Sequence, residues 1–531
     1  MRDKLLKAAG IMGVMTLLSR VLGLFRDIVN ARSFGTSWQW DAFIYAFMVP
    51  NFFRRIVAEG ALNSAFIPVY SGLLATQRKE EAQRFANQVL TVLTLFFMIF
   101  LFFIEMALYF LMKIPRISET LHLAFDLMRY LFPYLWAISL YSLGMGILNS
   151  HKRFFLSSLG PMILNLGWIV SVLWVIPHAG PHAEEQLRWL AVLLFLTALI
   201  EFCVEWPQLH TLGFRFRFIW DFGRGELRRF FQLLLPAALG FSIVPLNVLV
   251  DMTLGLWIGK GASSSLWYGN HLMQFPMALF AISMGTALLP TMSRQIAQKN
   301  NVQAEKSFLF SVKSVFLIVL PASLGLMILR LPIMQFLFEG GKFDAVSSAR
   351  ASMVLLCYTF GLTAYSGLRI ITTAFFSFQD TKTPSKIAAL GFGLNIVMNL
   401  ILMGPLREAG LALATSLSGI LQFVLLAVIL HRKHLAFRVA QFKIFLLKLA
   451  LAAAGMAVLC WLTLEGIESI RFSNVFLWKM ARVFAPMAVA VLAYGAFAWL
   501  LKIEEFKDLF RVLKEKKKNT SLSPGEDEIE D

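Results

Sequence analysis

The chain consists mainly of long apolar stretches separated by short polar loops. A stretch of ~20 apolar residues can cross the hydrocarbon core of a bilayer as a helix, and about fourteen stretches approach that length. We expect one membrane-spanning helix near each of residues 11–34, 42–68, 89–112, 121–148, 157–176, 187–209, 230–258, 265–290, 308–331, 351–376, 384–403, 410–430, 445–464 and 478–501. The pattern predicts an all-α polytopic membrane protein.

Composition and charge agree with this fold class. Apolar residues make up 58% of the chain and charged residues 15%, which is not the composition of a soluble globule. By our count roughly 29 Lys and Arg residues lie in the loops of one predicted side and roughly 12 in those of the other, a positive-inside pattern. Both termini are therefore predicted to be cytoplasmic. The net charge of +17 fits loops beside an anionic leaflet, so no nucleic-acid partner is expected.

An internal repeat is visible at a separation of 224 residues. It relates Asp27 to Asp251, Gly35 to Gly259, and Tyr141-Ser142 to Tyr365-Ser366. Transporters are often built from such repeats. We therefore expect two six-helix lobes, residues 1–210 and 211–440, followed by two further helices in residues 441–502 and a charged cytoplasmic tail in residues 503–531.

The first two spans carry charges that a lipid-facing helix would avoid. An ionisable side chain near the bilayer centre costs at least ~3 kcal/mol on insertion scales, so such groups are expected to face protein or water. In the second span, Pro50 removes a helix hydrogen bond just before the charged positions. The charged residues are Arg20, Arg26, Asp27, Arg54, Arg55 and Glu59.

Two interpretations of these charges are open. Arg26 and Asp27 could neutralise one another, Arg20 could extend to the membrane surface, and Arg55 could pair with Glu59 four residues later. Alternatively, the excess positive charge lines a cavity. Guanidinium groups bind phosphate oxygens in a bidentate manner, so the second interpretation predicts an anionic cargo such as a diphosphate.

Five segments carry a resemblance to a known family. They are SRVLGLFRD from Ser19, DAFIYAFMVPNFFRRIVAEGALNSAFIPVYS from Asp41, LFEGGKFDA from Leu337, FFSFQDTKTPSKIA from Phe375 and GPLREAGLALATS from Gly404. In order and spacing the chain resembles the MurJ (MviN) lipid II flippases of bacteria over nearly its whole length. The resemblance implies a MATE-like core of twelve helices in two lobes, with the last two helices forming a groove for a polyprenyl tail.

The resemblance also implies a function. It indicates a transporter, not an enzyme, that moves lipid II from the cytoplasmic to the outer leaflet of the inner membrane for cell wall synthesis. Alternating access of a cationic cavity is the expected mechanism. The expected partners are lipid II, membrane lipids and, as candidate neighbours, proteins of peptidoglycan synthesis.

Head-group positions follow from the matching segments. The resemblance implies that Arg26, Asp27 and Arg54 contact the head group, with Arg20, Asp41, Arg55 and Glu59 in support. In the eighth helix the family usually has an arginine in a stretch similar to YADRLMEFP, whereas WYGNHLMQFP places His271 there. Because an unperturbed histidine has a pKa of ~6.5, His271 would give a pH-dependent charge. A neutral, hydrogen-bonded His271 is the alternative.

The resemblance extends to a set of residues with which some family members would bind sodium. The corresponding oxygen ligands are Asp251, Asn395, Asn399, Thr415 and the Leu411 carbonyl. All can coordinate a hard cation. The set has one carboxylate, and asparagines in a membrane span often only join helices, so both interpretations stay open. No other cofactor is expected.

Three other functions are open to a polytopic membrane protein. An exporter of drug cations would need carboxylates in its cavity, but the first two spans are net positive. An enzyme acting on polyprenyl diphosphates would need a catalytic or metal-binding cluster, and no DDxxD-like, HExxH or Walker motif occurs in the chain. A flippase for another polyprenyl-diphosphate-linked oligosaccharide, such as an O-antigen or capsule precursor, is the remaining alternative.

Overall fold

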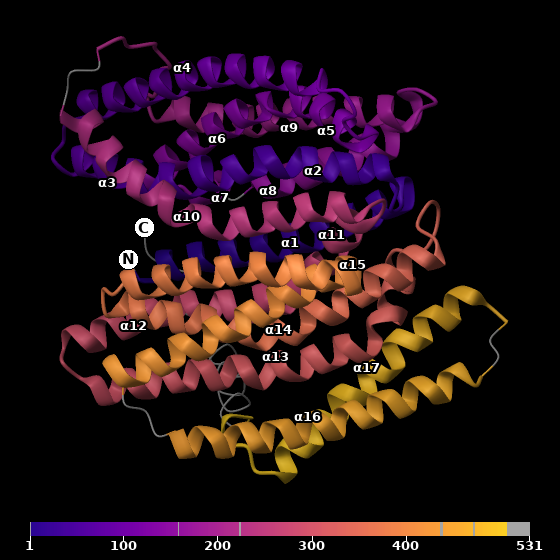
Figure 1. Ribbon diagram of the computed structural model, residues 1–531. Coiled ribbons are helices and arrows are strands. Elements are labelled where there is room, and N and C mark those ends of the chain that lie inside the picture. The colour runs from indigo at the N-terminus through magenta and orange to yellow at the C-terminus, as the bar shows by residue number, and fades with distance from the viewer. Residues whose placement is uncertain (1, 158, 222–224, 436–438, 471–472, 507–531) are drawn as a thin grey trace, which may run out of the picture. The chain divides into compact units, whose positions relative to one another are not determined.

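The computed structural model describes residues 2–157, 159–221, 225–435, 439–470 and 473–506. These residues form helices joined by short loops (Figure 1), and within those ranges no β-strand is found beyond one bridge between Gly340 and Phe343. Ten of their helical stretches are long and apolar enough to cross a membrane. The predicted all-α membrane fold is confirmed, and the number of fourteen crossings stays a prediction.

Helices cover the predicted spans, with π-helical segments at Arg54–Ala61, Ser171–Val175 and Ala278–Ile282. The α-helices are α1 (Arg2–Phe34), α2 (Trp38–Phe53), α3 (Leu62–Ala75), α4 (Lys79–Met112), α5 (Glu119–Leu131), α6 (Pro133–Ser150), α7 (Phe154–Ser157), α8 (Gly160–Val170), α9 (Ala183–Thr211), α10 (Gly225–Ile258), α11 (Ala262–Met277), α12 (Ser283–Ala297), α13 (Asn301–Leu337), α14 (Ala345–Ser377), α15 (Lys382–Lys433), α16 (Val439–Glu468) and α17 (Val475–Leu500). Helix α15 contains two predicted spans and turns sharply at Arg407, where φ is 52° and ψ is −135°.

The sequence repeat recurs in the boundaries of the helices. Helices α1 and α10 end at Phe34 and Ile258, α2 and α11 begin at Trp38 and Ala262, and π-helical segments begin at Arg54 and Ala278. Each pair is 224 residues apart. Gly35 and Gly259 follow the first helix of each repeat with φ of +64° and +124°, a region that favours glycine. The duplication predicted from a few residues is therefore also visible in the helices.

The chain divides into two compact units that do not follow the repeat boundary. The first unit comprises Met1–Tyr268, Phe338–Ala351 and Ile396–Leu411, and the second comprises Gly269–Leu337, Ser352–Asn395 and Ala412–Asp531. Helix α10, which begins the second repeat, thus belongs to the first unit. The predicted lobes, residues 1–210 and 211–440, stay a prediction.

Within the first unit, the turn after α1 packs against the glycine-rich segment of Phe338–Ala351. The backbone N–H of Lys342 donates to the carbonyl of Arg32 at 2.9 Å. Gly35 and Gly341 both lie where an added methyl group would overlap the opposite backbone, and Gly341 has φ of +58°. Close backbone approach therefore explains Gly341, the second glycine of the GGKFDA sequence.

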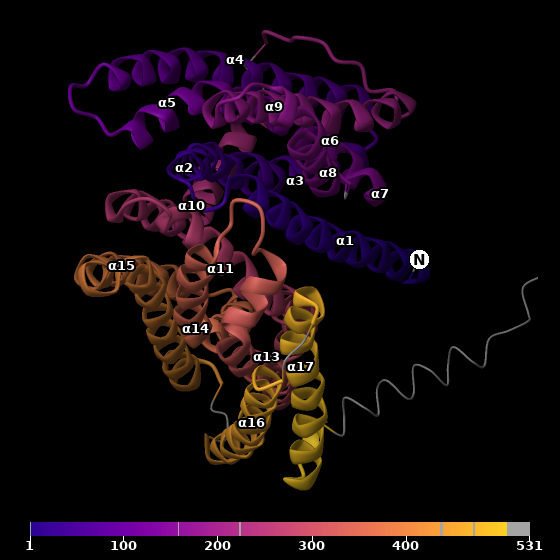
Figure 2. The same cartoon turned by 90° about the vertical axis from the view of Figure 1, so that its right-hand side faces the viewer.

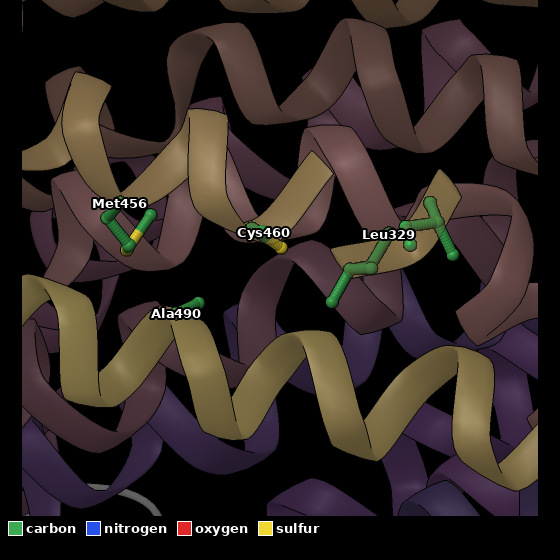
Figure 3. Close-up of a cluster of buried hydrophobic side chains, with 5 residues drawn as sticks. Leu329, Met456, Cys460 and Ala490 are labelled. Carbon is green, nitrogen blue, oxygen red and sulfur yellow. The ribbon is translucent and has the colours of Figure 1, made fainter. Parts of the chain in front are cut away.

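Within the second unit, α16 and α17 pack against each other and against α13 (Figure 2). Five buried residues form the centre of this contact: Leu329, Met456, Cys460, Leu464 and Ala490. Figure 3 shows the side chains of Leu329, Met456 and Cys460 directed toward the region beside Ala490. Because the contact is apolar and closely packed, it fixes the two C-terminal helices on α13.

Polar contacts flank this apolar cluster at both ends. Arg482 of α17 is buried, donates to Gln335 at 2.8 Å and pairs with Glu468. At the other end, Lys313 pairs with Glu505 at 2.6 Å. The first residues of the predicted charged tail therefore return to α13, whereas residues 507–531 of that tail lie outside the described residues.

Asp380 organises the turn of the FFSFQDTKTP segment in the second unit. Its carboxylate accepts hydrogen bonds from the Thr383 backbone at 3.0 Å and from Lys433 at 2.6 Å. Burial acts to raise the pKa of Asp380, but the hydrogen bonds from Lys433, Thr383 and His434 outweigh it and lower the pKa below its usual range. An ionised Asp380 thus joins the start of α15 to its end.

We expect Gly341→Ala to lower the free energy of unfolding by about 1–3 kcal/mol, the usual cost of a residue held in an unfavourable backbone region, because φ is positive and the methyl group would meet the Arg32 backbone. Gly325→Ala is the control, since Gly325 lies in α13 with open space around its Cα. Thermal unfolding of both variants in the same detergent is the measurement. Equal midpoints would contradict the close backbone contact.

Candidate functional site

Arg26 is the centre of the predicted cationic site, and the first unit holds it tightly. Its side chain is 13% exposed, and its Nη2 atom lies 2.8 Å from Asp27 Oδ1. Nη1 donates to Asn165 Oδ1 of α8 at 3.1 Å. Local neutralisation by Asp27, one of the two interpretations of the sequence, is therefore present, and an incoming anion would have to share Arg26 with Asp27.

Two tryptophan rings surround the Arg26 guanidinium. Its central carbon lies 4.8 Å from the ring centroid of Trp168 on α8 and 5.9 Å from that of Trp267 on α11. The Trp267 indole N–H donates to Asp27 at 3.4 Å, and that of Trp168 donates to Asn30 at 3.0 Å. Cation–π contacts of a desolvated guanidinium contribute about 2 kcal/mol. The site is thus a charged pair between aromatic walls.

The second predicted group lies where α2 loses regular α-helical geometry. Pro50 stands inside α2, and the π-helical segment Arg54–Ala61 follows directly. The predicted interruption after Pro50 is therefore present. Arg54 Nε donates to Asn51 Oδ1 at 2.8 Å, which fixes one edge of the guanidinium. Single π-helical turns are often found at functional sites.

The other predicted head-group residues have diverse surroundings. Arg20 on α1 and Arg55 in the π-helical segment are exposed, and the side chain of Glu59 lies outside the described residues. His271, on the part of α11 that belongs to the second unit, is half-buried. The structure thus gives direct contacts for Arg26, Asp27 and Arg54, and their role in binding a head group stays a prediction.

Asp41 is placed differently from the other predicted residues. It is 1% exposed, and its carboxylate accepts hydrogen bonds from the backbone N–H groups of Gly261 at 2.5 Å and Ser264 at 2.7 Å, and from the Ser264 hydroxyl. These donors surround the beginning of α11, so Asp41 caps that helix from α2. Nearby, Arg350 pairs with Glu408 at 2.6 Å and donates to the Lys260 carbonyl.

The candidate sodium ligands are distributed over both units. In the first unit, Asp251 is 3% exposed and accepts a hydrogen bond from Asn399 Nδ2 at 2.7 Å, and Leu411 is buried. In the second unit, Asn395 donates to Thr415 at 3.2 Å. The part of the chain that the structure describes contains no group of three or more His, Cys, Asp or Glu residues suited to a metal ion.

The sequence does not identify Trp168, Asn165 and Trp267 as residues of the site. Asn165 and Trp168 are three residues apart in an otherwise apolar helix, a spacing that places them on one face. That spacing is the sequence feature that could have indicated them. Asn165 lies 139 residues from Arg26 in the sequence, and no local sequence pattern predicts a contact between residues so far apart.

Known proteins are similar to this chain over most of its length. The family described as "Lipid II flippase MurJ" matches residues 30–481. A "Probable lipid II flippase MurJ" of Vibrio cholerae is 33% identical over 472 residues, which cover 86% of this chain and 89% of that protein. A protein of the same description from Haemophilus influenzae is 28% identical over 510 residues, covering 92% and 99%.

Solved structures are similar as well. A structure described as lipid II flippase MurJ in an inward closed conformation has a TM-score of 0.76 at 25% identity and covers 94% of this chain and 99% of that one. An inward-facing MATE family transporter of the MOP superfamily has a TM-score of 0.62 at 15% identity, covering 77% and 93%. The second likeness extends to the fold and supports the predicted MATE-like core.

We expect Asp41→Asn to destabilise the protein by about 1–3 kcal/mol, because the amide group places donor N–H groups beside the donors of Gly261 and Ser264. Ser264→Ala removes only the hydroxyl donor and should cost less. Thermal unfolding of the two variants beside the wild type tests this order. An Asp41→Asn variant as stable as the wild type would contradict the capping role.

Proposed function

Because the chain belongs to the lipid II flippase MurJ family, whose members are transporters and not enzymes, we propose that it moves lipid II across the bacterial inner membrane. The movement runs from the cytoplasmic to the outer leaflet. The observation within the molecule that supports this most directly is the Arg26–Asp27 pair between Trp168 and Trp267. A flippase for another polyprenyl-diphosphate-linked oligosaccharide remains the alternative.

The diphosphate of the head group binds at Arg26 and Arg54 in this proposal. With no anion present, Asp27 balances the charge of Arg26, so the guanidinium can stay within the apolar interior. A diphosphate offers more acceptor oxygens than one carboxylate, and it can take over N–H groups of the guanidinium in a bidentate manner. Asn165 and the two tryptophans hold the plane of the Arg26 guanidinium during this exchange.

Alternating access requires that one end of the cavity close while the other opens. In the first unit, contacts that would serve closure lie at the end predicted to face outward. They are the capping of α11 by Asp41, the Arg350–Glu408 pair and the hydrogen bond of 2.7 Å between Thr36 and Ser347. We infer that these contacts break when the head group is released to the outside. The π-helical segment after Pro50 supplies a place where the helix can bend.

The polyprenyl tail is assigned to α16 and α17. One face of this pair packs against α13, and the remaining faces carry exposed apolar side chains, among them Leu447, Leu451, Val458, Val491 and Leu492. Apolar side chains exposed on a membrane protein face lipid tails. The assignment keeps the tail within the bilayer, while only the head group enters the cavity.

Sodium is a further proposal. Asp251, Asn395, Asn399, Thr415 and the Leu411 carbonyl would hold the ion, and all are oxygen donors suited to a hard cation. In the structure Asn399 turns its amide nitrogen toward Asp251, so its amide group would have to rotate to present oxygen. When bound, sodium would neutralise the Asp251 carboxylate.

Arg26→Ala and Arg54→Ala should each abolish complementation of a strain depleted of its lipid II flippase, because the diphosphate would lose a guanidinium partner. Growth and the amount of lipid II accessible from outside are the two readouts, with expression and membrane insertion checked for each variant. Arg294→Ala is the control, because Arg294 is exposed on α12. His271→Ala, measured beside them, tells whether that position matters.

The outcome separates the two cargo classes. The wild-type protein could be inserted and yet restore neither growth nor accessible lipid II. If incompatibility with the host's lipid II variant is excluded as the reason, this result would favour the oligosaccharide-precursor alternative. Restoration by Arg26→Ala at normal expression would contradict the proposed diphosphate site.

For sodium, the wild-type protein should unfold at a higher temperature in NaCl than in KCl of equal ionic strength, since an ion that binds the folded state stabilises it. Asp251→Asn should remove this difference, because it removes the carboxylate among the ligands. Thermal unfolding in the two salts is the measurement. An identical salt response of the wild type and Asp251→Asn would exclude this site.

A further inference from the structure

Two glutamates lie inside the apolar interior of the first unit and take no part in the site described above. Glu201 and Glu205 are one helical turn apart on α9, within a stretch apolar enough to span a membrane. Their side chains are 1% and 0% exposed. Ionisable residues within a membrane span are rare and usually mark a pathway for ions or protons.

Glu205 points into the contact of α9 with α6. Its Oε2 atom lies against the backbone of Gly144, where an added methyl group would overlap the carboxyl group, and the Leu209 side chain is the next neighbour of that position. Neither Glu205 Oε atom has a hydrogen-bond partner within the described residues, and both are shielded from solvent. The carboxyl group is therefore enclosed by helix backbone and apolar side chains.

The helices around α9 bring no described cation to Glu205. Helices α7 and α8 carry no titratable side chain, α6 carries Tyr134 and Tyr141, and α2 carries Asp41 and Tyr45. The acids and bases of α5, and His178 of the 3₁₀ turn Ile176–His178, lie beside the beginning of α9, where Asp126 pairs with Arg188. Arg153 reaches the end of α9 but bonds to Thr211. The charged group that acts on Glu205 is Glu201.

The repeat provides an internal comparison. At a separation of 224 residues, Glu201 and Glu205 correspond to Leu425 and Ile429 of α15. At the same separation, Gly144 corresponds to Leu368 of α14. The corresponding positions of the second repeat therefore carry apolar side chains. Packing alone therefore does not require carboxyl groups on α9.

Burial without a described cation decides the state of Glu205. An ionised carboxylate without partners in an apolar interior is costly, and a second carboxylate one turn away adds repulsion. Glu205, whose carboxyl oxygens have no described hydrogen-bond partner, is therefore expected to keep its proton. A proton is also the one cation that needs no further oxygen ligands, and neither Glu205 Oε atom has a described hydrogen-bond partner.

We propose that Glu205, with Glu201 beside it, binds a proton in the first unit and releases it when the contact of α6 with α9 opens to water. Proton uptake then favours the closed contact and release favours the open one, since a proton can shift only the equilibrium between states that bind it differently. The coupling of this step to transport rests on the proposed flippase function. The binding of the proton does not.

Labelling with dicyclohexylcarbodiimide tests the site directly. This apolar reagent adds to protonated carboxyl groups, and peptide mass spectrometry locates the adduct. In the wild-type protein in lipid nanodiscs we expect an adduct on Glu205 at neutral pH. Above the midpoint each pH unit should lower the protonated fraction about tenfold. Glu105, which pairs with Arg129 at the surface, is the internal control and should not react.

Labelling of variants and labelling in the presence of Na⁺ test the proposal further. Glu205→Gln should abolish the adduct, and Glu201→Gln should move the loss of labelling to lower pH, because the neighbouring negative charge is gone. Labelling of denatured but not native wild-type protein at neutral pH would overturn the proposal. Suppression of labelling by Na⁺ at constant pH would overturn it in favour of a sodium site. The wild-type measurement needs no variant, so misfolding of Glu205→Gln cannot obscure it.

Coupling is measured in proteoliposomes that transfer lipid II. An imposed pH gradient should change the transfer rate of the wild type, and the ratio of the rates with and without the gradient should fall to about one in Glu205→Gln. A wild type that is labelled on Glu205 but transfers no lipid II would reject the flippase function and leave the proton site standing. An equal response of both proteins to the gradient would reject the coupling.

Discussion

The cost of placing a charge inside an apolar membrane protein determines how the first unit is built. A guanidinium can lie there only if its N–H groups are bonded and its charge is balanced. Arg26 meets both conditions through Asp27 on its own helix and Asn165 on α8. Trp168 and Trp267 complete the enclosure, so this one side chain of α1 contacts both α8 and α11.

The cost of burying a charge is met in a different way on α9. There the structure brings a second carboxyl group to Glu205 and no described cation, so a proton is the remaining way to balance the charge. Arg26 carries a charge that does not depend on its surroundings, whereas the charge of Glu205 depends on whether water reaches it. A fixed charge suits the binding of an anionic head group. A variable charge suits a response to the opening and closing of helices.

Features that depend on neighbouring residues could be predicted from the sequence. The spans, the Arg26–Asp27 pair and the interruption after Pro50 all arise within a few residues of chain, and the repeat needed only a common separation. Contacts between distant segments could not be predicted. The capping of α11 by Asp41 joins residues 223 apart, and nothing near Asp41 in the sequence distinguishes a cap from a cavity residue.

The repeat also shows where the two halves diverged. Arg26 corresponds to Val250, so the second half lacks this arginine, while Asp27 corresponds to Asp251 and is retained. In the first half the aspartate balances a guanidinium, and in the second half it accepts a hydrogen bond from the uncharged Asn399 amide. The same carboxylate therefore contacts a guanidinium in one repeat and a neutral amide in the other. Duplication of the helices kept the fold, and the difference of a single charged residue changed the surroundings of the retained aspartate.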